Sequence, residues 1–169
     1  MLMTTNYDRQ RAVAYANEWA YRRNPRFLDF QELGGDCTNF VSQCLYYANS
    51  VMNFTPTFGW YYLSADNRTA SWTGVPYLYN FLISNDGPGP YARQTTIDDM
   101  QPGDVIQLGG EDGTFHHSLI VTKLDGPPTP ATIQVAAHTN DSLCRPLDTY
   151  SYADIRFLHI EGVRYTVDQ

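Results

Sequence analysis

The stretch GGDCTNFVSQCLYYANS, residues 34–50, constrains the fold more than any other part of the chain. After the Gly34-Gly35 pair, apolar side chains recur at the three- and four-residue spacing of a helix with one buried face. The apolar positions are Phe40, Val41, Cys44, Leu45, Ala48 and Val51. The pattern predicts a helix that begins at Cys37. Unpaired N–H groups and the positive end of the helix dipole stabilise a thiolate in this first turn, so Cys37 is predicted to be a reactive cysteine.

The rest of the chain changes character near its middle. The spacing predicts a helix over 7–23 that Asp8 caps, and a short helix over 74–84 with Pro76 in its first turn, while residues 53–73 lack periodicity and are expected to form an ordered loop. Strands are predicted at 105–108, 116–124, 132–138 and 155–165, the last with a bend at Gly162. Helices followed by antiparallel strands indicate the α+β class.

Length and composition are typical of one globular domain over residues 1–169, with a core from about 7 to 165. Hydrophobic residues make up 43% of the chain and charged residues 17%. The net charge of −7 argues against nucleic acid and anionic membranes as partners, and no apolar run is long enough to span a bilayer. The opening MLMTTNYDRQ has no apolar signal core, so the chain is either cytoplasmic or a domain cut from a longer exported protein.

The cysteines and histidines limit the available chemistry. Three cysteines are too few for a disulfide framework, although a Cys44–Cys144 bridge stays open. His116 and His117 are adjacent and should point to opposite faces of a strand. A hairpin folded about the midpoint of DGPPTP, residues 125–130, makes His117 and His138 cross-strand neighbours unless a bulge shifts the register.

These positions predict the site of a cysteine hydrolase. Cys37 is the predicted nucleophile, His117 the general base and later acid, and His138 the residue that orients His117. Asn140 is the reserve for that third role. His116 replaces His117 as the base if the strand is turned by one residue.

Several motifs resemble a known family when they are read in order: GGDCTNFVSQCLY, SW at Ser71-Trp72, PGDVI, HHSLIV and HTND. The chain resembles the amidase domains of Gram-positive bacteria, relatives of NlpC-type and CHAP cell-wall peptidases, from about Tyr7 to Tyr165. The resemblance implies a papain-like fold, in which the helix that carries the nucleophile packs on an antiparallel sheet that carries the histidine.

The resemblance also implies roles for single residues. Cys37, His117 and His138 match the nucleophile, the base and the polar third residue. Asp36 matches an acid that holds the free amine of a peptide stem, and Trp72 is the aromatic candidate for the wall of the substrate cleft. Thr38-Asn39 replaces the Ser-Gly common in NlpC-type relatives, so the resemblance does not extend to their γ-linked glutamyl substrate.

Two functions follow from this interpretation. The first is a cysteine-dependent hydrolase of amides or peptides, acting on bacterial cell-wall material such as peptidoglycan fragments and needing no cofactor. The second is a non-catalytic module that binds a wall peptide or protein on the same scaffold. A zinc site formed by Cys37, His117 and His138 is a third interpretation, but no CxxC, HxxxH or HExxH spacing accompanies these residues.

Overall fold

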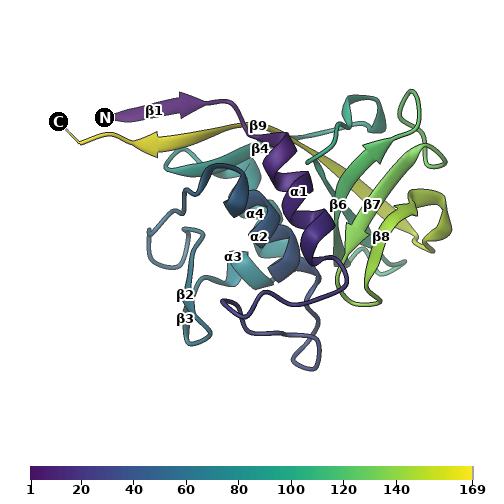
Figure 1. Cartoon of the computed structure of the whole chain (residues 1–169), viewed down its shortest axis with the longest axis horizontal. Helices are drawn as coiled ribbons and strands as arrows, with labels where there is room; N and C mark the ends of the chain where they lie inside the picture. The colour runs from purple at the N-terminus through teal and green to yellow at the C-terminus, as the bar shows by residue number, and fades with distance from the viewer. Residues whose placement is uncertain (169) are drawn as a thin grey trace.

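The computed structural model describes residues 1–168 and has a mixed α+β architecture (Figure 1), as the sequence predicted. The helices are α1 (Arg9–Trp19), α2 (Cys37–Asn49), α3 (Ala70–Thr73) and α4 (Val75–Ser84), with short 3-10 turns η1 (Ile97–Asp99) and η2 (Leu147–Thr149). The strands are β1 (Leu2–Thr5), β2 (Tyr62–Ser64), β3 (Asn67–Arg68), β4 (Gly89–Thr95), β5 (Val105–Gly109), β6 (Phe115–Leu124), β7 (Ile133–Ala137), β8 (Ser142–Pro146) and β9 (Asp154–Thr166).

The main sheet is antiparallel and has the order β1-β9-β5-β6-β7-β8, with β4 paired to β9 on its other edge. Strand β9 is long enough to pair with β5 near its start and with β1 near its end. The β1–β9 ribbon therefore projects from the body and carries both termini, while β6, β7 and β8 lie at the opposite end of the molecule (Figure 1).

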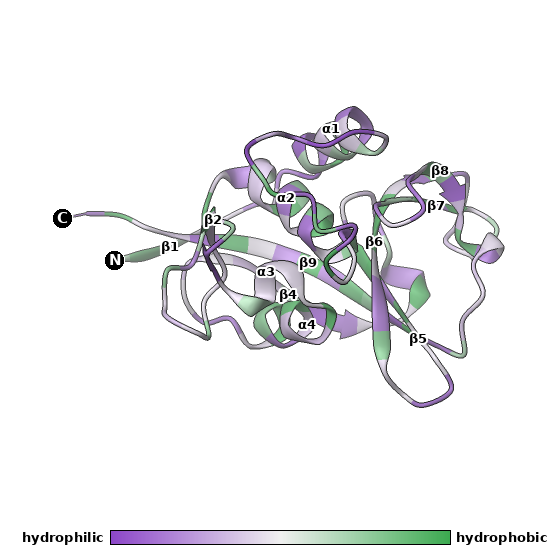
Figure 2. Ribbon diagram, turned by 90° about the horizontal axis from the view of Figure 1, so that it is seen from below, coloured by the Kyte–Doolittle hydropathy of each residue, from purple (hydrophilic) through white to green (hydrophobic). Residues whose placement is uncertain are grey.

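Helix α2 lies at the centre of the molecule, where its burial extends beyond the single apolar stripe that the sequence predicted and includes Asn39, Ser42 and Gln43. Every residue from Cys37 to Leu45 is buried, because α1, α3, α4, β6 and β7 all pack against this helix. Figure 2 shows α1 and α2 together over one side of the sheet. The nucleophile candidate thus begins a helix that is enclosed on all sides.

The alternation of side chains along the strands divides the apolar residues between two cores. Val105, Ile120 and Leu158 point toward the helices and join the larger core. Ile106 and Leu119, their neighbours in the chain, belong to a second core on the other face of the sheet, which Leu147 of η2 and Met100 also join. Both faces of the β5–β7 sheet are consequently buried.

The predicted elements differ from the structure mainly at their ends. Asp8 caps α1 through the N–H of Arg11, as predicted, but α1 ends at Trp19 rather than near Arg23. The bend expected near Gly162 is present as a shift of register in the pairing of β4 with β9. A side chain at Gly162 would lie 2.7 Å from the Tyr91 hydroxyl and 3.2 Å from the Thr5 carbonyl, so a larger residue at this close crossing would force Tyr91 to shift.

Three strands of the main sheet were not predicted, namely β1, β4 and β8. All three lie at edges of the sheet, where one side of the strand has no partner. Edge strands do not need a continuous apolar face, so periodicity gives little sign of them. The expected loop over 53–73 also contains the small β2–β3 hairpin and helix α3.

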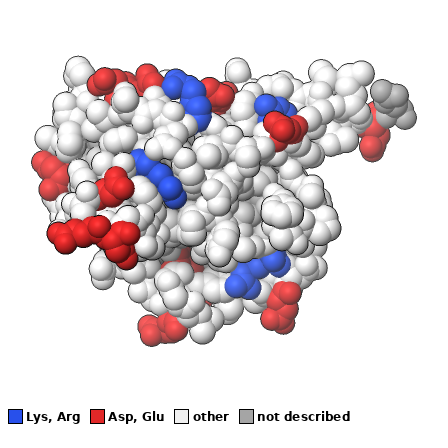
Figure 3. Space-filling model, turned by 180° about the vertical axis from the view of Figure 1, so that it is seen from behind, with Lys and Arg blue, Asp and Glu red and all other residues white. Residues whose placement is uncertain are grey.

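Charged groups and cysteines agree with an ordinary globular surface. Figure 3 shows separate acidic clusters and no continuous basic patch on that face of the molecule.

None of the helices in residues 1–168 is long and apolar enough to cross a membrane. All three cysteines are free thiols, so the Cys44–Cys144 bridge that stayed open is not formed.

Candidate active site

A glycine turn introduces Cys37 at the first position of α2. Gly34 and Gly35 have φ angles of 103° and 107°, a left-handed conformation that favours glycine. A side chain at Gly35 would meet the Thr139 hydroxyl at 3.4 Å, and the same hydroxyl accepts a hydrogen bond from the Asp36 N–H at 3.2 Å. The loop before the helix is therefore fixed against the turn that follows β7.

The Cys37 thiol faces strand β6. Its exposed fraction is 7%, and Sγ lies 3.8 Å from the Thr38 hydroxyl, which in turn bonds to the Ser118 hydroxyl at 2.9 Å. Burial raises the pKa of the thiol, whereas hydrogen bonds from the N–H groups of Ser118 and Thr38 act in the opposite direction. The resting thiol is thus protonated, and donors that can stabilise its thiolate are already in place.

Asp36 is a structural residue in this fold rather than a surface for a substrate amine. It is fully buried, and Oδ1 accepts hydrogen bonds from the N–H of Phe30 and the side-chain amide of Asn39. Oδ2 lies 2.5 Å from His138 Nδ1 and 3.5 Å from Arg23 Nε. Both oxygens already have partners, so the expected role in substrate binding is not met.

His138 also has both of its ring nitrogens engaged. Nδ1 bonds to Asp36, Nε2 donates to the carbonyl of Trp19 at 2.8 Å, and the ring stacks on Phe40 at a centroid distance of 4.0 Å. With an exposed fraction of 1%, His138 connects the end of α1, the start of α2 and the end of β7. It does not orient His117 in this structure, contrary to the expectation.

The register of the β6–β7 hairpin explains why His138 does not lie beside His117. The Cα partners are Val121↔Val135 and Ile120↔Ala136, and the register shifts between Val121 and Lys123. The strands are therefore displaced by one residue from the pairing that would place His117 opposite His138. Because side chains alternate between faces, one residue of displacement separates the two rings.

His117 is the one histidine whose ring nitrogens make no hydrogen bond to any residue in the described range 1–168. His116 Nδ1 bonds to the Leu108 carbonyl, His159 Nδ1 bonds to Asp104, and His138 is fully engaged. No hydrogen bond joins His117 to the Cys37 thiol within that range. The side chain of its neighbour Ser118 faces the cysteine, since its hydroxyl bonds to Thr38, whereas strand alternation directs the His117 ring to the other face of β6, opposite Leu108.

The electrostatic surroundings keep His117 neutral. Burial, together with the nearby charges of His116 and Arg145, lowers the pKa of its imidazole to about 4. At neutral pH the ring therefore has a free acceptor nitrogen. Such a nitrogen can take a proton from a thiol or from water.

A polar pocket of 280 Å³ lies beside His117. Its lining residues are Leu108, His116, His117, Thr139, Asn140, Arg145, Tyr150 and Ser151. Thr139 connects this pocket to the cysteine loop through its bond to the Asp36 N–H. Sequence reasoning had reached His116, His117 and Asn140 but had missed Thr139, Arg145 and Tyr150. Thr139 lies in the turn after β7, Arg145 in the edge strand β8 and Tyr150 directly after η2, a segment that showed no periodic pattern.

The backbone around this pocket is unusual. Thr139 and Asn140 have φ angles of 68° and 59°, and Cys144 in β8 has a φ of 54°. Residues other than glycine rarely adopt this region, and such residues cluster at functional sites. The turn that contains the predicted reserve residue Asn140 thus has the strained geometry that is often found beside a binding site.

Trp72 belongs to the apolar core and not to a cleft wall. Its exposed fraction is zero, its ring packs on Trp60 at a centroid distance of 4.6 Å, and its indole N–H donates to Asn39 at 3.0 Å. Asn39 in turn donates to Asp36. Trp72 therefore supports the start of α2 from behind rather than contacting a substrate.

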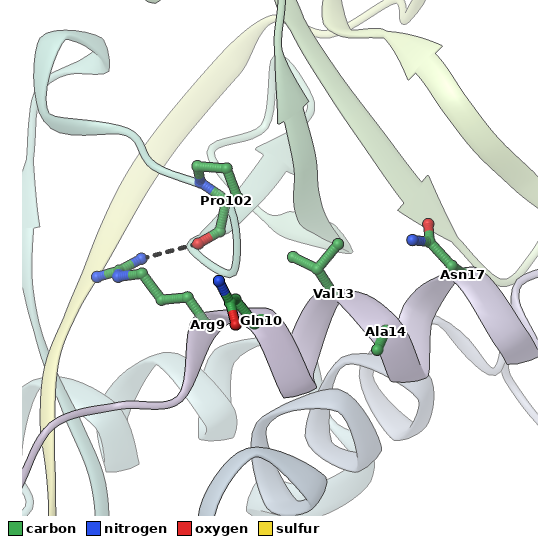
Figure 4. Close-up of a pocket in the computed structure, with 6 residues that line it drawn as sticks. All are labelled: Arg9, Gln10, Val13, Ala14, Asn17 and Pro102. Atoms are coloured by element: carbon green, nitrogen blue, oxygen red, sulfur yellow. Dashed lines mark hydrogen bonds between the residues drawn. The ribbon is translucent and has the colours of Figure 1, made fainter.

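A second, more apolar groove of 410 Å³ lies along the outer face of α1 (Figure 4). Its lining residues are Arg9, Gln10, Val13, Ala14, Asn17 and Pro102, and Arg9 donates a hydrogen bond to the Pro102 carbonyl at 3.0 Å. None of these side chains is a nucleophile or a base that titrates near neutrality. The pocket beside His117 is therefore the better candidate for chemistry.

The residues considered for zinc do not form a metal site. No group of three or more His, Cys, Asp or Glu side chains within residues 1–168 is arranged to hold a metal ion. His138, one of the three residues considered, uses both nitrogens in protein contacts.

Comparisons with known proteins agree with a hydrolytic site. The family model described as "Putative amidase domain" matches residues 6–160. The uncharacterized protein YhbB of Bacillus subtilis (strain 168) is 36% identical over 152 residues, which cover 88% of this chain and 45% of that protein. The chain thus spans less than half the length of this relative, and no solved structure matches it significantly. The match over residues 6–160 shows that the chain belongs to this amidase-domain family, whose description indicates an amide hydrolase.

Proposed function

We propose that the protein is a cysteine-dependent amide hydrolase with a papain-like arrangement, related to the NlpC-type and CHAP peptidases. The observation that carries the proposal is the position of the Cys37 thiol. It begins a buried helix and lies 3.8 Å from the Thr38 hydroxyl, which bonds to the hydroxyl of Ser118, the residue that follows His117. Of the four histidines, His117 has the free ring nitrogens that a general base requires.

The proposed reaction begins with a neutral thiol and a neutral imidazole. His117 turns to the thiol and takes its proton as the sulfur attacks the carbonyl carbon of the amide. The first backbone hydrogen bond of α2 joins the Phe40 N–H to the Asp36 carbonyl, so the N–H groups of Cys37, Thr38 and Asn39 have no partner within the helix and are available to the oxyanion.

The C–N bond then breaks, and His117 gives its proton to the leaving amine. This step leaves a thioester on Cys37. Water that is deprotonated by His117 attacks the thioester, and the carboxylic acid and the free thiol are released. Asn140 replaces His138 as the candidate that orients His117, because Asn140 and His117 line the same pocket.

The proposed substrate is a peptide or amide of bacterial cell-wall material, on the basis of the family resemblance. The test is incubation with defined peptidoglycan fragments and identification of the products by mass spectrometry. Turnover should be lost in Cys37→Ala and His117→Ala and retained in two matched controls, Cys144→Ser and His116→Ala. Normal turnover in either of the first two variants would falsify the assignment.

A second candidate function is a module that binds a wall peptide without cleaving it. The observations that favour it are the buried, protonated thiol and the lack of a hydrogen bond between Cys37 and His117 in the part of the chain that the structure describes. Alkylation by iodoacetamide in a Cys144→Ser background separates the two functions, since this background removes the exposed thiol. Catalysis requires that Cys37 reacts near neutral pH much faster than Cys44 and that His117→Ala slows the reaction. Equally slow labelling of both cysteines supports binding alone.

A further inference from the structure

The pocket beside His117 contains a cation that no carboxylate neutralises. Arg145 makes no ion pair with any acidic residue in the described range 1–168, although the chain has a net charge of −7. Arg9 and Arg23 are paired with carboxylates, but Arg11, Arg26, Arg68, Arg156 and Arg164 also have no acidic partner within residues 1–168, so what distinguishes Arg145 is its place in the pocket. A cation that stays unpaired in an acidic protein and lines a pocket is suited to an anionic ligand.

The guanidinium of Arg145 is held in one orientation before any ligand binds. It lies over the ring of Tyr150 at 3.6 Å from the centroid, which is a cation–π geometry. Nε donates to the Thr149 hydroxyl at 2.7 Å, and Nη2 donates to the Thr149 carbonyl at 3.0 Å. Nη1 donates to no residue within 1–168, so this amino group of the guanidinium is left to donate to a ligand.

The Tyr150 hydroxyl adds a second observation at the same place. It is buried and makes no hydrogen bond of normal geometry to any residue within 1–168, although the side chains of Ser142 and Arg145 lie near it. A buried hydroxyl without a partner is costly, and a ligand oxygen can provide that partner. The ring of Tyr150 also lies beside that of His117, with a centroid distance of 5.8 Å.

We propose that Arg145 and Tyr150 form a subsite for a carboxylate of the substrate in the pocket that His117 lines. The inference rests on the proposed function, because it places this subsite next to His117 as the base. It makes the protein selective for amides or peptides that carry a free carboxylate near the bond to be cleaved. A planar guanidinium with a free arm and a phenolic hydroxyl match the two oxygens of a carboxylate.

Binding is tested separately from catalysis with the Cys37→Ala protein, which keeps the pocket and cannot form a thioester. The probes are two matched pairs: acetyl-alanyl-alanine against its C-terminal amide, and acetyl-glutamyl-alanine amide against the glutamine analogue. Affinities are measured by titration with the His117 ring signals followed by NMR. In at least one pair, the acid should bind about tenfold or more tightly than the matching amide. The two pairs distinguish a terminal carboxylate from a side-chain carboxylate.

Variants then assign the preference to the subsite. Arg145→Gln in the same background should abolish the preference for the acid, and Arg145→Lys should retain part of it because the charge remains. Arg11→Gln removes the same charge from the exposed face of α1 and should leave the preference unchanged. Tyr150→Phe should weaken binding of the acid and leave binding of the amide unchanged.

The outcomes separate this inference from the proposed function. Equal affinities for acid and amide, no binding of the acids at millimolar concentration, or a preference that persists in Arg145→Gln would overturn the subsite. An acid preference that Arg145→Gln removes, found in a protein whose Cys37 does not hydrolyse any amide tested, leaves the subsite intact and removes the enzyme. Hydrolysis of amides with no preference for a neighbouring carboxylate would support the enzyme and overturn the subsite.

Discussion

His117 and His138 were expected to form a pair, and the structure gives them opposite surroundings. His138 is enclosed, stacked on Phe40 and bonded through both nitrogens to Asp36 and the Trp19 carbonyl. His117 lines a pocket and uses neither nitrogen in a contact with the described residues. The comparison shows that the hydrogen-bond partners of a histidine, more than its position in a motif, distinguish a structural ring from one available for chemistry.

A second buried pair supports this interpretation of His138. Asp104 is fully buried and bonds to His159 Nδ1, to Arg9 and to the N–H of Ile160. That pair tightens the junction of β5 with β9 and α1, with no cysteine in the cluster. Asp36 and His138 repeat the same construction at the start of α2, which indicates a role in holding the helix.

The largest expected effect in this comparison is on activity. His117→Ala should lower kcat/KM for a responsive amide by about 10²- to 10⁴-fold, the range typical of a lost general acid–base group. The free energy of unfolding should change by less than about 1 kcal/mol, since the ring makes no hydrogen bond to any of residues 1–168. Steady-state kinetics and urea denaturation of one preparation measure both. A variant that unfolds easily while its kcat/KM stays normal would reverse the assignment of the two histidines.

The next largest effect is on stability and concerns His138. His138→Ala leaves the buried Asp36 carboxylate without its main partner, so the free energy of unfolding should fall by about 3 kcal/mol. The measurement is urea denaturation at pH 7, with His116→Ala as a control at an exposed histidine. Full stability in His138→Ala would show that the bonds to Asp36 and Trp19 contribute little.

His117 should also make the stability depend on pH, with a change in the free energy of unfolding similar to or slightly smaller than that expected for His138→Ala. Its folded pKa of about 4 lies below the unfolded value of about 6.5, so the unfolded chain binds a proton that the folded protein does not between these limits. This contribution is fully present above about pH 6.5 and is lost as the pH falls toward 4, by up to about 3 kcal/mol. His117→Asn should remove that part of the slope and leave the rest. Parallel curves for both proteins between pH 4 and 6.5 contradict the lowered pKa.

The smallest effect is expected at the exposed neighbour of the base. His116→Ala should change kcat/KM by no more than about threefold, because its ring bonds to the Leu108 carbonyl and the residue is largely exposed. It should also raise the pKa of His117 slightly, since the charge of His116 contributes to lowering that pKa. NMR titration of the His117 ring detects this shift. A loss of activity as large as that of His117→Ala would move the base to His116.

The sequence was most informative where packing follows one continuous pattern. The spacing of apolar residues predicted the start of α2 at Cys37 and the extent of α4. It also predicted the central parts of β5, β6 and β7. The position of the reactive thiol candidate was predicted for the same reason.

The composition of the pocket depends on features that spacing does not reveal. A register shift between Val121 and Lys123 separates His117 from His138, and nothing in the alternation of apolar residues marks it. Arg145 and Tyr150 line the pocket together with Thr139 and Asn140, which adopt left-handed conformations that are rare for a threonine. Asp36 appeared available for a ligand because its burial depends on contacts with residues far away in the chain.

The enclosure of α2 has a consequence for how such a protein adapts to different substrates. Since neighbouring elements immobilise the helix that carries the sulfur, the nucleophile is the stationary component of the site. Changes in substrate recognition are then expected around His117 and in the β7–β8 hairpin, because the edge strand β8 tolerates substitutions. A scaffold of this design can change what it recognises by altering one peripheral hairpin, while its reactive atom remains where it is.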